Sequence, residues 1–149
     1  KVLGYFDRHR EYRWLKDGVC VKSGKEIINK WKLFISKADG AAGQIGNPVP
    51  ARIMGKAELA DPGTVCSETY LVVGPFNNKK EAKNVQAYMA TKFFRFMVGI
   101  RKNKNMPRET YKSVPIVDFS KKWSDSELYK LFGLSNEEID YIEKMITEA

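Results

Sequence analysis

Apolar residues follow two kinds of pattern along the chain, and these patterns predict strands in some segments and a helix in another. Short apolar runs bounded by turn residues are typical of strands, and they cover residues 2–6, 19–21, 31–36, 52–59, 64–74 and 114–119. From residue 79 to about Arg101 the apolar period is helical, carried by Ala82, Val85, Met89, Phe93, Phe96, Met97 and Ile100. We interpret this stretch as one long amphipathic helix that begins after Asn78.

Three serines are each followed three residues later by a glutamate, which is the spacing of a capping box at a helix start: Ser23–Glu26, Ser124–Glu127 and Ser135–Glu138. We therefore expect a short helix at residues 26–30 and a pair of short helices near the C-terminus. Gly133 is placed to end the first helix of that pair. The fold class predicted is α+β, with a small mixed or antiparallel sheet, one long amphipathic helix across it and the C-terminal helical pair.

The length of 149 residues fits a single domain, residues 1–149, that can bury a core without metal or disulfide staples. No apolar stretch approaches the roughly 20 residues that span a bilayer. The chain begins with Lys1 and not with methionine, so we expect it to be a fragment of a larger protein.

Cysteine and histidine usage excludes several classes of site. The two cysteines, Cys20 and Cys66, are too few for a secreted disulfide framework and lack CxxC spacing, so we expect reduced, buried thiols in a cytoplasmic protein. His9 is the single histidine of the chain, which disfavours a zinc site of the usual His/Cys type. We expect no catalytic residue, no metal and no cofactor in this chain.

Charge is distributed unevenly. The net charge is +8, but residues 1–123 carry 24 bases and 11 acids, a net of +13, whereas residues 124–149 carry two bases and seven acids, a net of −5. A basic α+β body with an acidic helical pair favours a polyanion as the partner of the body; a basic surface without such a partner is the alternative. Membrane-surface binding is disfavoured, because the bases do not lie on one face of an amphipathic helix.

The segment after the predicted long helix, residues 101–112, contains five bases and a tyrosine, without an apolar period. A solvated loop is one interpretation; a DNA-contacting loop, with cations on phosphates and a tyrosine on a sugar or base, is the other. The predicted contacts are Lys37, Arg101, Lys102, Lys104, Arg108, Tyr111 and Lys112, with Arg8, Arg10 and Arg13 as a second basic patch.

Sequence motifs that would indicate catalysis are only partly matched in this chain. Many metal-dependent nucleases use an aspartate followed later in the chain by a Glu-x-Lys sequence. Glu81 and Lys83 have the Glu-x-Lys spacing, and Asp61 is an upstream carboxylate, although Glu81 also stands where a helix cap uses it. Residues 47–50, NPVP, match only in part the (Asp/Asn)-Pro-Pro-(Tyr/Phe) tetrapeptide of adenine methyltransferases, because they lack the aromatic residue that stacks a flipped base.

Four segments carry a more distinctive signal: WKLFISKADGAAG at residues 31–43, EAKNV through TKFFRF at residues 81–96, VPIVDF at residues 114–119, and WSDSELYKLFGLS with EIDYI at residues 123–142. Together they resemble the C-terminal part of large restriction–modification proteins with an adenine-specific methyltransferase domain, including single-chain nuclease–methylase fusions. The similarity covers roughly residues 31–146.

In that family the C-terminal region is the target-recognition domain, which docks on duplex DNA and selects the site, while the catalytic motif and the S-adenosylmethionine site lie upstream. The resemblance thus implies a non-catalytic DNA recognition domain of a bacterial type II restriction–modification system. Its implied partners are double-stranded DNA and the upstream methyltransferase domain of the same chain. S-adenosylmethionine would belong to the parent protein, and whether that protein also cleaves DNA is left open.

Two alternatives remain at this point. One is a metal-dependent nuclease domain that uses Asp61, Glu81 and Lys83. The other is a partner-docking module of a restriction–modification complex, in which the acidic helices bind a partner and the charge of the body is incidental.

Overall fold

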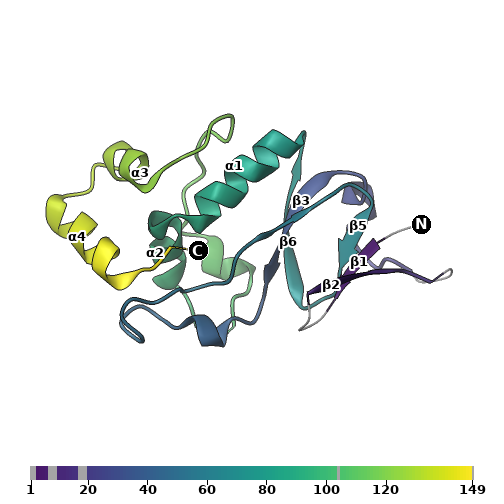
Figure 1. The fold of residues 1–149 in the computed structure, drawn as a ribbon, viewed down its shortest axis with the longest axis horizontal. Coiled ribbons are helices and arrows are strands. Elements are labelled where there is room, and N and C mark those ends of the chain that lie inside the picture. Colours follow the sequence, from purple (N-terminus) through teal and green to yellow (C-terminus); the bar gives the residue numbers. More distant parts are fainter. Residues whose placement is uncertain (1–2, 7–9, 17–19, 104, 149) are drawn as a thin grey trace.

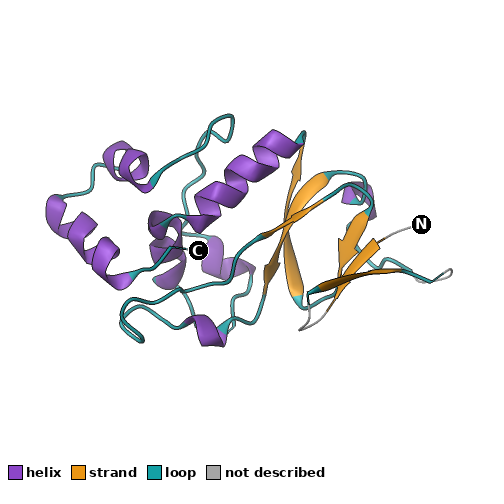
Figure 2. Cartoon of the chain, viewed as in Figure 1, coloured by secondary structure: helices purple, strands orange, loops and turns teal. Residues whose placement is uncertain are grey.

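Two three-stranded sheets and four α-helices make up the fold, seen in a computed structural model that describes residues 3–6, 10–16, 20–103 and 105–148 (Figures 1 and 2). In the first sheet, β1 (Leu3–Phe6) pairs antiparallel with β2 (Glu11–Trp14) and parallel with β5 (Thr64–Cys66). The second sheet is antiparallel, in the order β4 (Glu58–Ala60), β3 (Trp31–Ser36) and β6 (Tyr70–Phe76). The predicted α+β class is confirmed.

Strand β3 lies at the centre of the molecule and is buried on both faces, because successive side chains of a strand point to opposite sides. Leu33 and Ile35 join the large core beneath the helices, while Phe34 packs in a small second core with Tyr5 and Tyr70. This double burial explains why residues 31–36 form a nearly continuous apolar run, and the prediction of a strand there is confirmed.

The predicted long helix is two helices, α1 (Lys79–Ala90) and α2 (Lys92–Gly99), so the prediction of one continuous helix is wrong. Thr91 separates them with an extended backbone, at ψ 152°. Its hydroxyl donates to the carbonyl of Tyr88 (2.7 Å) and accepts from the backbone N–H of Phe94 (3.2 Å). A threonine side chain that bonds locally to the backbone competes with the helical hydrogen bonds and caps the new helix start.

A carboxylate from the C-terminal region completes the start of α2. Asp125 accepts hydrogen bonds from the backbone N–H groups of Lys92 (3.0 Å) and Phe93 (2.8 Å). Those N–H groups have no partner within the helix, and a negative charge is favourable at a helix N-terminus. Phe93 is buried in the core, as the stripe predicts, whereas Ile100, also predicted to face the core, is 57% exposed and Arg95 is buried.

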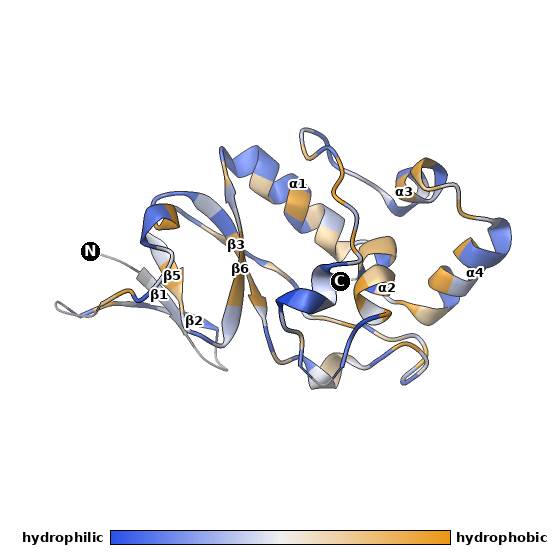
Figure 3. Cartoon of the chain, turned by 180° about the vertical axis from the view of Figure 1, so that it is seen from behind, coloured by the Kyte–Doolittle hydropathy of each residue, from blue (hydrophilic) through white to orange (hydrophobic). Residues whose placement is uncertain are grey.

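The acidic helical pair consists of α3 (Asp125–Leu131) and α4 (Asn136–Met145). Both predicted capping boxes are present, at Ser124 and at Ser135, and Gly133 ends α3 in a left-handed conformation, φ 65°. Leu128 and Ile142 place the two helices in the same core as α1 and α2. Figure 3 shows that α1 is hydrophilic at its first turn, whereas α2 is mainly apolar.

Other predicted elements differ from the structure. The single strand expected at residues 64–74 is two strands, β5 and β6, so that prediction is wrong in its continuity. The helix expected at residues 26–30 is a 3₁₀ turn over Lys25–Ile27, and the strand expected at residues 52–59 is reduced to β4. Residues 114–119 form no strand, because α1 holds them by side chains: the Tyr88 hydroxyl donates to the Pro115 carbonyl (2.8 Å) and the Asn84 amide to the Phe119 carbonyl (2.9 Å).

The segment at residues 19–21 is not a strand where it is described, at Cys20 and Val21; Val19 lies outside the described residues. Cys20 and Cys66 are free thiols, as expected, but Cys20 is exposed, so the prediction that both are buried is wrong. Burial raises the pKa of the Cys66 thiol to about 11. Within the described ranges, no helix is long and apolar enough to cross a membrane.

Replacing the carboxylate that caps α2 tests this description. We expect Asp125→Ala to lower the free energy of unfolding by about 1–2 kcal/mol, because two backbone N–H groups at the start of α2 lose their acceptor. Urea denaturation followed by circular dichroism measures the change. Asp140→Ala, at an exposed position of α4, is the control and should change it by less than about 0.5 kcal/mol; equal effects of the two would contradict the capping role.

Candidate nucleic-acid interface

A basic groove of about 720 Å³ runs along α1 in the described part of the chain. It is lined by six cationic residues and by no carboxylate: Lys56, Lys79, Lys80, Lys83, Arg95 and Lys122. The remaining lining residues are small, apolar or amide side chains. Clustered cations without counter-charges produce a positive potential that attracts polyanions.

Three separate parts of the chain build the groove. The first turns of α1 present Lys79, Lys80 and Lys83, which share a face because residues three and four apart are neighbours on a helix. Lys56 comes from the segment before β4, which α1 holds through a hydrogen bond from the Gln86 amide to the Ala57 carbonyl (2.8 Å). Lys122 comes from the segment before α3. All five lysines are exposed.

Arg95 lines the same groove but is only 1% exposed. Its Nη1 donates to the backbone carbonyl of Arg52 (2.6 Å), and its Nε has no hydrogen-bond partner among the described residues. Burial, together with the nearby positive charge of Arg52, lowers the pKa of Arg95 to about 10. The groove therefore contains a buried, incompletely bonded guanidinium.

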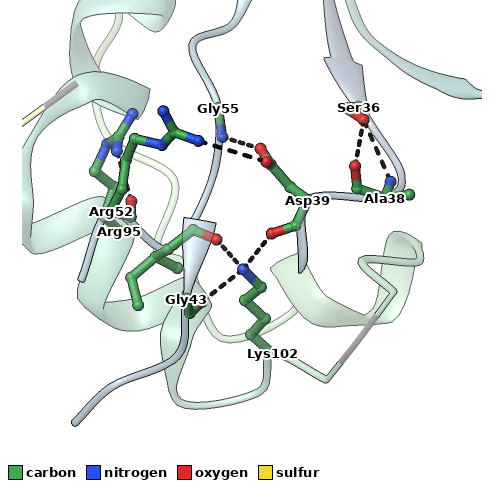
Figure 4. A network of polar contacts seen from close by, with 9 residues as sticks. Ser36, Ala38, Asp39, Gly43, Arg52, Gly55, Arg95 and Lys102 are labelled. Atoms are coloured by element: carbon green, nitrogen blue, oxygen red, sulfur yellow. Dashed lines mark hydrogen bonds and ion pairs between the residues drawn. The ribbon is translucent and has the colours of Figure 1, made fainter. Parts of the chain in front are cut away.

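Asp39 lies beside these two arginines (Figure 4). Its carboxylate is 3.9 Å from the Arg52 guanidinium and also accepts the backbone N–H of Gly55. The guanidinium of Arg10 approaches the same place, with Nη2 3.3 Å from where a β-carbon on Gly55 would lie. Arg10, from the second predicted basic patch, thus lies beside Gly55, the residue that precedes the groove residue Lys56.

Lys102, predicted as a DNA contact, is buried instead. Its ammonium donates to the carbonyls of Asp39 (2.8 Å), Gly43 (2.7 Å) and Ile53 (Figure 4). Burial lowers its pKa. Lys102 ties the irregular segment 39–53 to the end of α2, so its place in the fold corrects the prediction that it faces DNA.

The rest of the predicted loop is divided between surface and interior. Arg101, Arg108 and Lys112 are exposed, and the Nε of Arg101 donates to the Ser113 hydroxyl. Tyr111, predicted to offer its ring to DNA, lies elsewhere. Its hydroxyl is buried, and its ring lies 6.4 Å from that of Phe94, so it belongs to the core.

Two other predicted contacts, Lys37 and Arg13, are not among the residues that line the groove. Lys37 is half-buried, and its segment is joined to the predicted loop by a hydrogen bond from the Met106 N–H to the Lys37 carbonyl (2.7 Å). Arg13 is exposed on β2 and paired with Glu11 (3.1 Å). Arg8 and Lys104 lie outside the described residues.

Sequence reasoning missed the groove. The one available signal was the spacing of Lys79, Lys80 and Lys83 at the start of a predicted helix, which puts three cations on one face. Lys56 and Lys122 are isolated along the chain, and Arg95 stands within a helical segment whose apolar stripe predicts core. Only the folded arrangement brings these residues together.

A second hollow, of about 1040 Å³, lies between the end of α1 and the acidic helices and differs in charge. Its lining includes Asp125, Glu143 and Glu148 as well as Lys122 and Lys130. The Glu143 carboxylate accepts from the Tyr129 hydroxyl (2.9 Å) and pairs with the Lys92 ammonium, which lowers its pKa. The mixed charge of this hollow makes it a poorer match for a polyanion than the groove along α1.

The residues proposed for nuclease chemistry take local roles in the fold. Glu81 accepts a hydrogen bond from the backbone N–H of Asn77 (3.0 Å), and its own N–H bonds to the Asn78 side chain (2.9 Å), as expected for the capping of α1. Lys83 is a groove residue. In the described ranges, no group of three or more His, Cys, Asp or Glu side chains is arranged to hold a metal ion.

Comparisons of the chain with protein-family models, with curated proteins and with solved structures gave no match. Function is therefore inferred from the groove and from the residues of this chain.

The buried position of Lys102 leads to a direct test. We expect Lys102→Met to lower the free energy of unfolding by about 2–4 kcal/mol, because three buried carbonyl groups lose a charged donor. Chemical denaturation measures the loss. The control is Arg101→Met, at an exposed neighbouring position, which should lower the free energy of unfolding by less than about 0.5 kcal/mol. If the Lys102 variant is as stable as this control, the buried role of Lys102 is contradicted.

Proposed function

We propose that this chain is a non-catalytic DNA recognition domain that binds duplex DNA along the groove beside α1. The observation that carries the proposal is the groove itself, in which five exposed lysines and Arg95 converge without a carboxylate in the lining. Lysines near DNA phosphates release condensed counterions, which is the main source of sequence-independent affinity.

The placement of the cations suits a nucleic-acid backbone. The groove runs along helix α1, which has 12 residues. Its lysines lie at the N-terminal end, where the helix dipole also favours an anion. Lys56 and Lys122 extend the positive surface beyond the helix. A phosphate backbone lying along this surface would meet several cations in succession, which supports DNA over a small anion as the main partner.

The residues of the chain also support a more specific proposal. The four segments that resemble the target-recognition region of adenine-specific methyltransferases contain most of α1, α2 and α4 and all of α3. We infer that the chain selects the DNA site for a type II restriction–modification methyltransferase in the bacterial cytoplasm. The upstream domain of the parent protein would bind S-adenosylmethionine and carry out the methyl transfer.

Reversal of charge in the groove tests the proposed function. We expect Lys79→Glu, Lys80→Glu and Lys83→Glu, combined, to weaken duplex binding by at least tenfold, about 1.4 kcal/mol. The slope of log affinity against log salt should fall by about 0.9 for each phosphate that is no longer neutralised. Fluorescence anisotropy of a labelled random duplex, titrated at several salt concentrations, measures both quantities.

A matched control separates the groove from net charge. The combination Lys22→Glu, Lys25→Glu and Lys30→Glu makes the same change in charge at exposed positions outside the groove lining, and it should reduce affinity much less. If the control weakens binding equally, general charge and not the groove determines affinity.

A third variant, Arg101→Glu with Arg108→Glu and Lys112→Glu, measures what the exposed part of the predicted loop contributes. A larger loss of duplex affinity in this variant than in the groove variant would indicate that the loop, and not α1, forms the interface. Absence of binding by the unmodified chain even at about 50 mM salt, where phosphate contacts are strong, would favour the partner-docking module.

A further inference from the structure

Arg95 is unusual among the groove residues because it is enclosed and yet incompletely bonded. A buried charge is normally paired or fully hydrogen-bonded, since the loss of hydration is otherwise uncompensated. The bond from Nη1 to the Arg52 carbonyl accounts for one donor, and Nε lies buried without an acceptor among the described residues. An acceptor from outside the chain would complete its bonding.

The charges around Arg95 favour an anion as that acceptor. The Nη1 of Arg95 bonds to the Arg52 carbonyl, and the positive charge of Arg52 disfavours the charged form of Arg95. Asp39, whose charge acts on Arg95 in the opposite sense, is already engaged by the Arg52 guanidinium and the Gly55 N–H. The surrounding groove adds five lysines and no acid. An anion at this position would therefore reduce repulsion as well as satisfy Nε.

We propose that Arg95 forms, at the floor of the groove, a binding site for one phosphate group, which in the complex belongs to the DNA backbone. The guanidinium presents Nε and Nη donors in a fixed planar fork that matches two oxygens of a phosphate. Because Arg95 is only 1% exposed, entry of the phosphate requires neighbouring side chains to change rotamer. This inference rests on the proposed function for the source of the phosphate, whereas the site itself would also accept free inorganic phosphate.

The test follows the Nε–Hε resonance of Arg95 by nuclear magnetic resonance in the unmodified, ¹⁵N-labelled chain. The chain is titrated first with inorganic phosphate at constant ionic strength and then with a short duplex. Arg101 is the reference, because its guanidinium is exposed and its Nε already bonds to the Ser113 hydroxyl. We expect the Arg95 resonance to shift and saturate in both titrations, with a much smaller response at Arg101.

A variant adds an independent measure. Arg95→Lys keeps a positive charge but removes the Nε donor and the planar fork, and we expect it to weaken inorganic phosphate binding by at least tenfold while the groove lysines remain. If the variant fails to fold, the resonance titration of the unmodified chain still decides, because it requires no substitution.

The outcomes distinguish this inference from the proposed function. Duplex binding with an Arg95 response no larger than that of Arg101 would overturn the phosphate site and leave DNA binding to the lysines. Saturable phosphate binding at Arg95 without duplex binding would support the site as one for free phosphate and contradict the proposed function. Absence of an Arg95 response to phosphate together with absence of duplex binding would contradict both.

Discussion

The interruption of the α1–α2 stripe at Thr91, capped by Asp125, is the constraint on which the rest of the structure depends. The Asp125 carboxylate accepts hydrogen bonds from the two backbone N–H groups at the start of α2, and these bonds join the acidic helical pair to the body. Beyond this cap, Arg95 is buried and lines the groove, while Ile100 is exposed. The cap thus fixes the helix that contributes Arg95, whereas the lysines of the groove come from α1 and from the segments before β4 and α3.

A charge count does not distinguish cations that bind a partner from cations that hold the fold together. Lys32 and Lys102 are both buried, and each donates its ammonium to three backbone carbonyls. Burial lowers the pKa of each, yet the carbonyls supply the bonds that water would have made. The five groove lysines are exposed instead, without a carboxylate in the lining, so their charge is directed outward and is available to a polyanion.

The parts of the fold that local physics determines could be predicted from sequence. The apolar run of β3 and the capping boxes at Ser124 and Ser135 are short-range patterns, and they were identified correctly. The break at Thr91 was missed because the apolar stripe continues across it, and the carboxylate that caps α2 comes 33 residues after Lys92. The groove was missed for the same reason, since Lys56 and Lys122 approach α1 only in the folded chain.

The most direct test of the central claim, that the groove beside α1 binds duplex DNA, is the salt dependence of duplex binding by the unmodified chain. Five exposed lysines in contact with phosphates predict a slope of log affinity against log salt of about −4 to −5, at about 0.9 per contact. Fluorescence anisotropy between about 50 and 200 mM salt gives this slope. A slope near zero, or no binding at the lowest salt, would contradict the account.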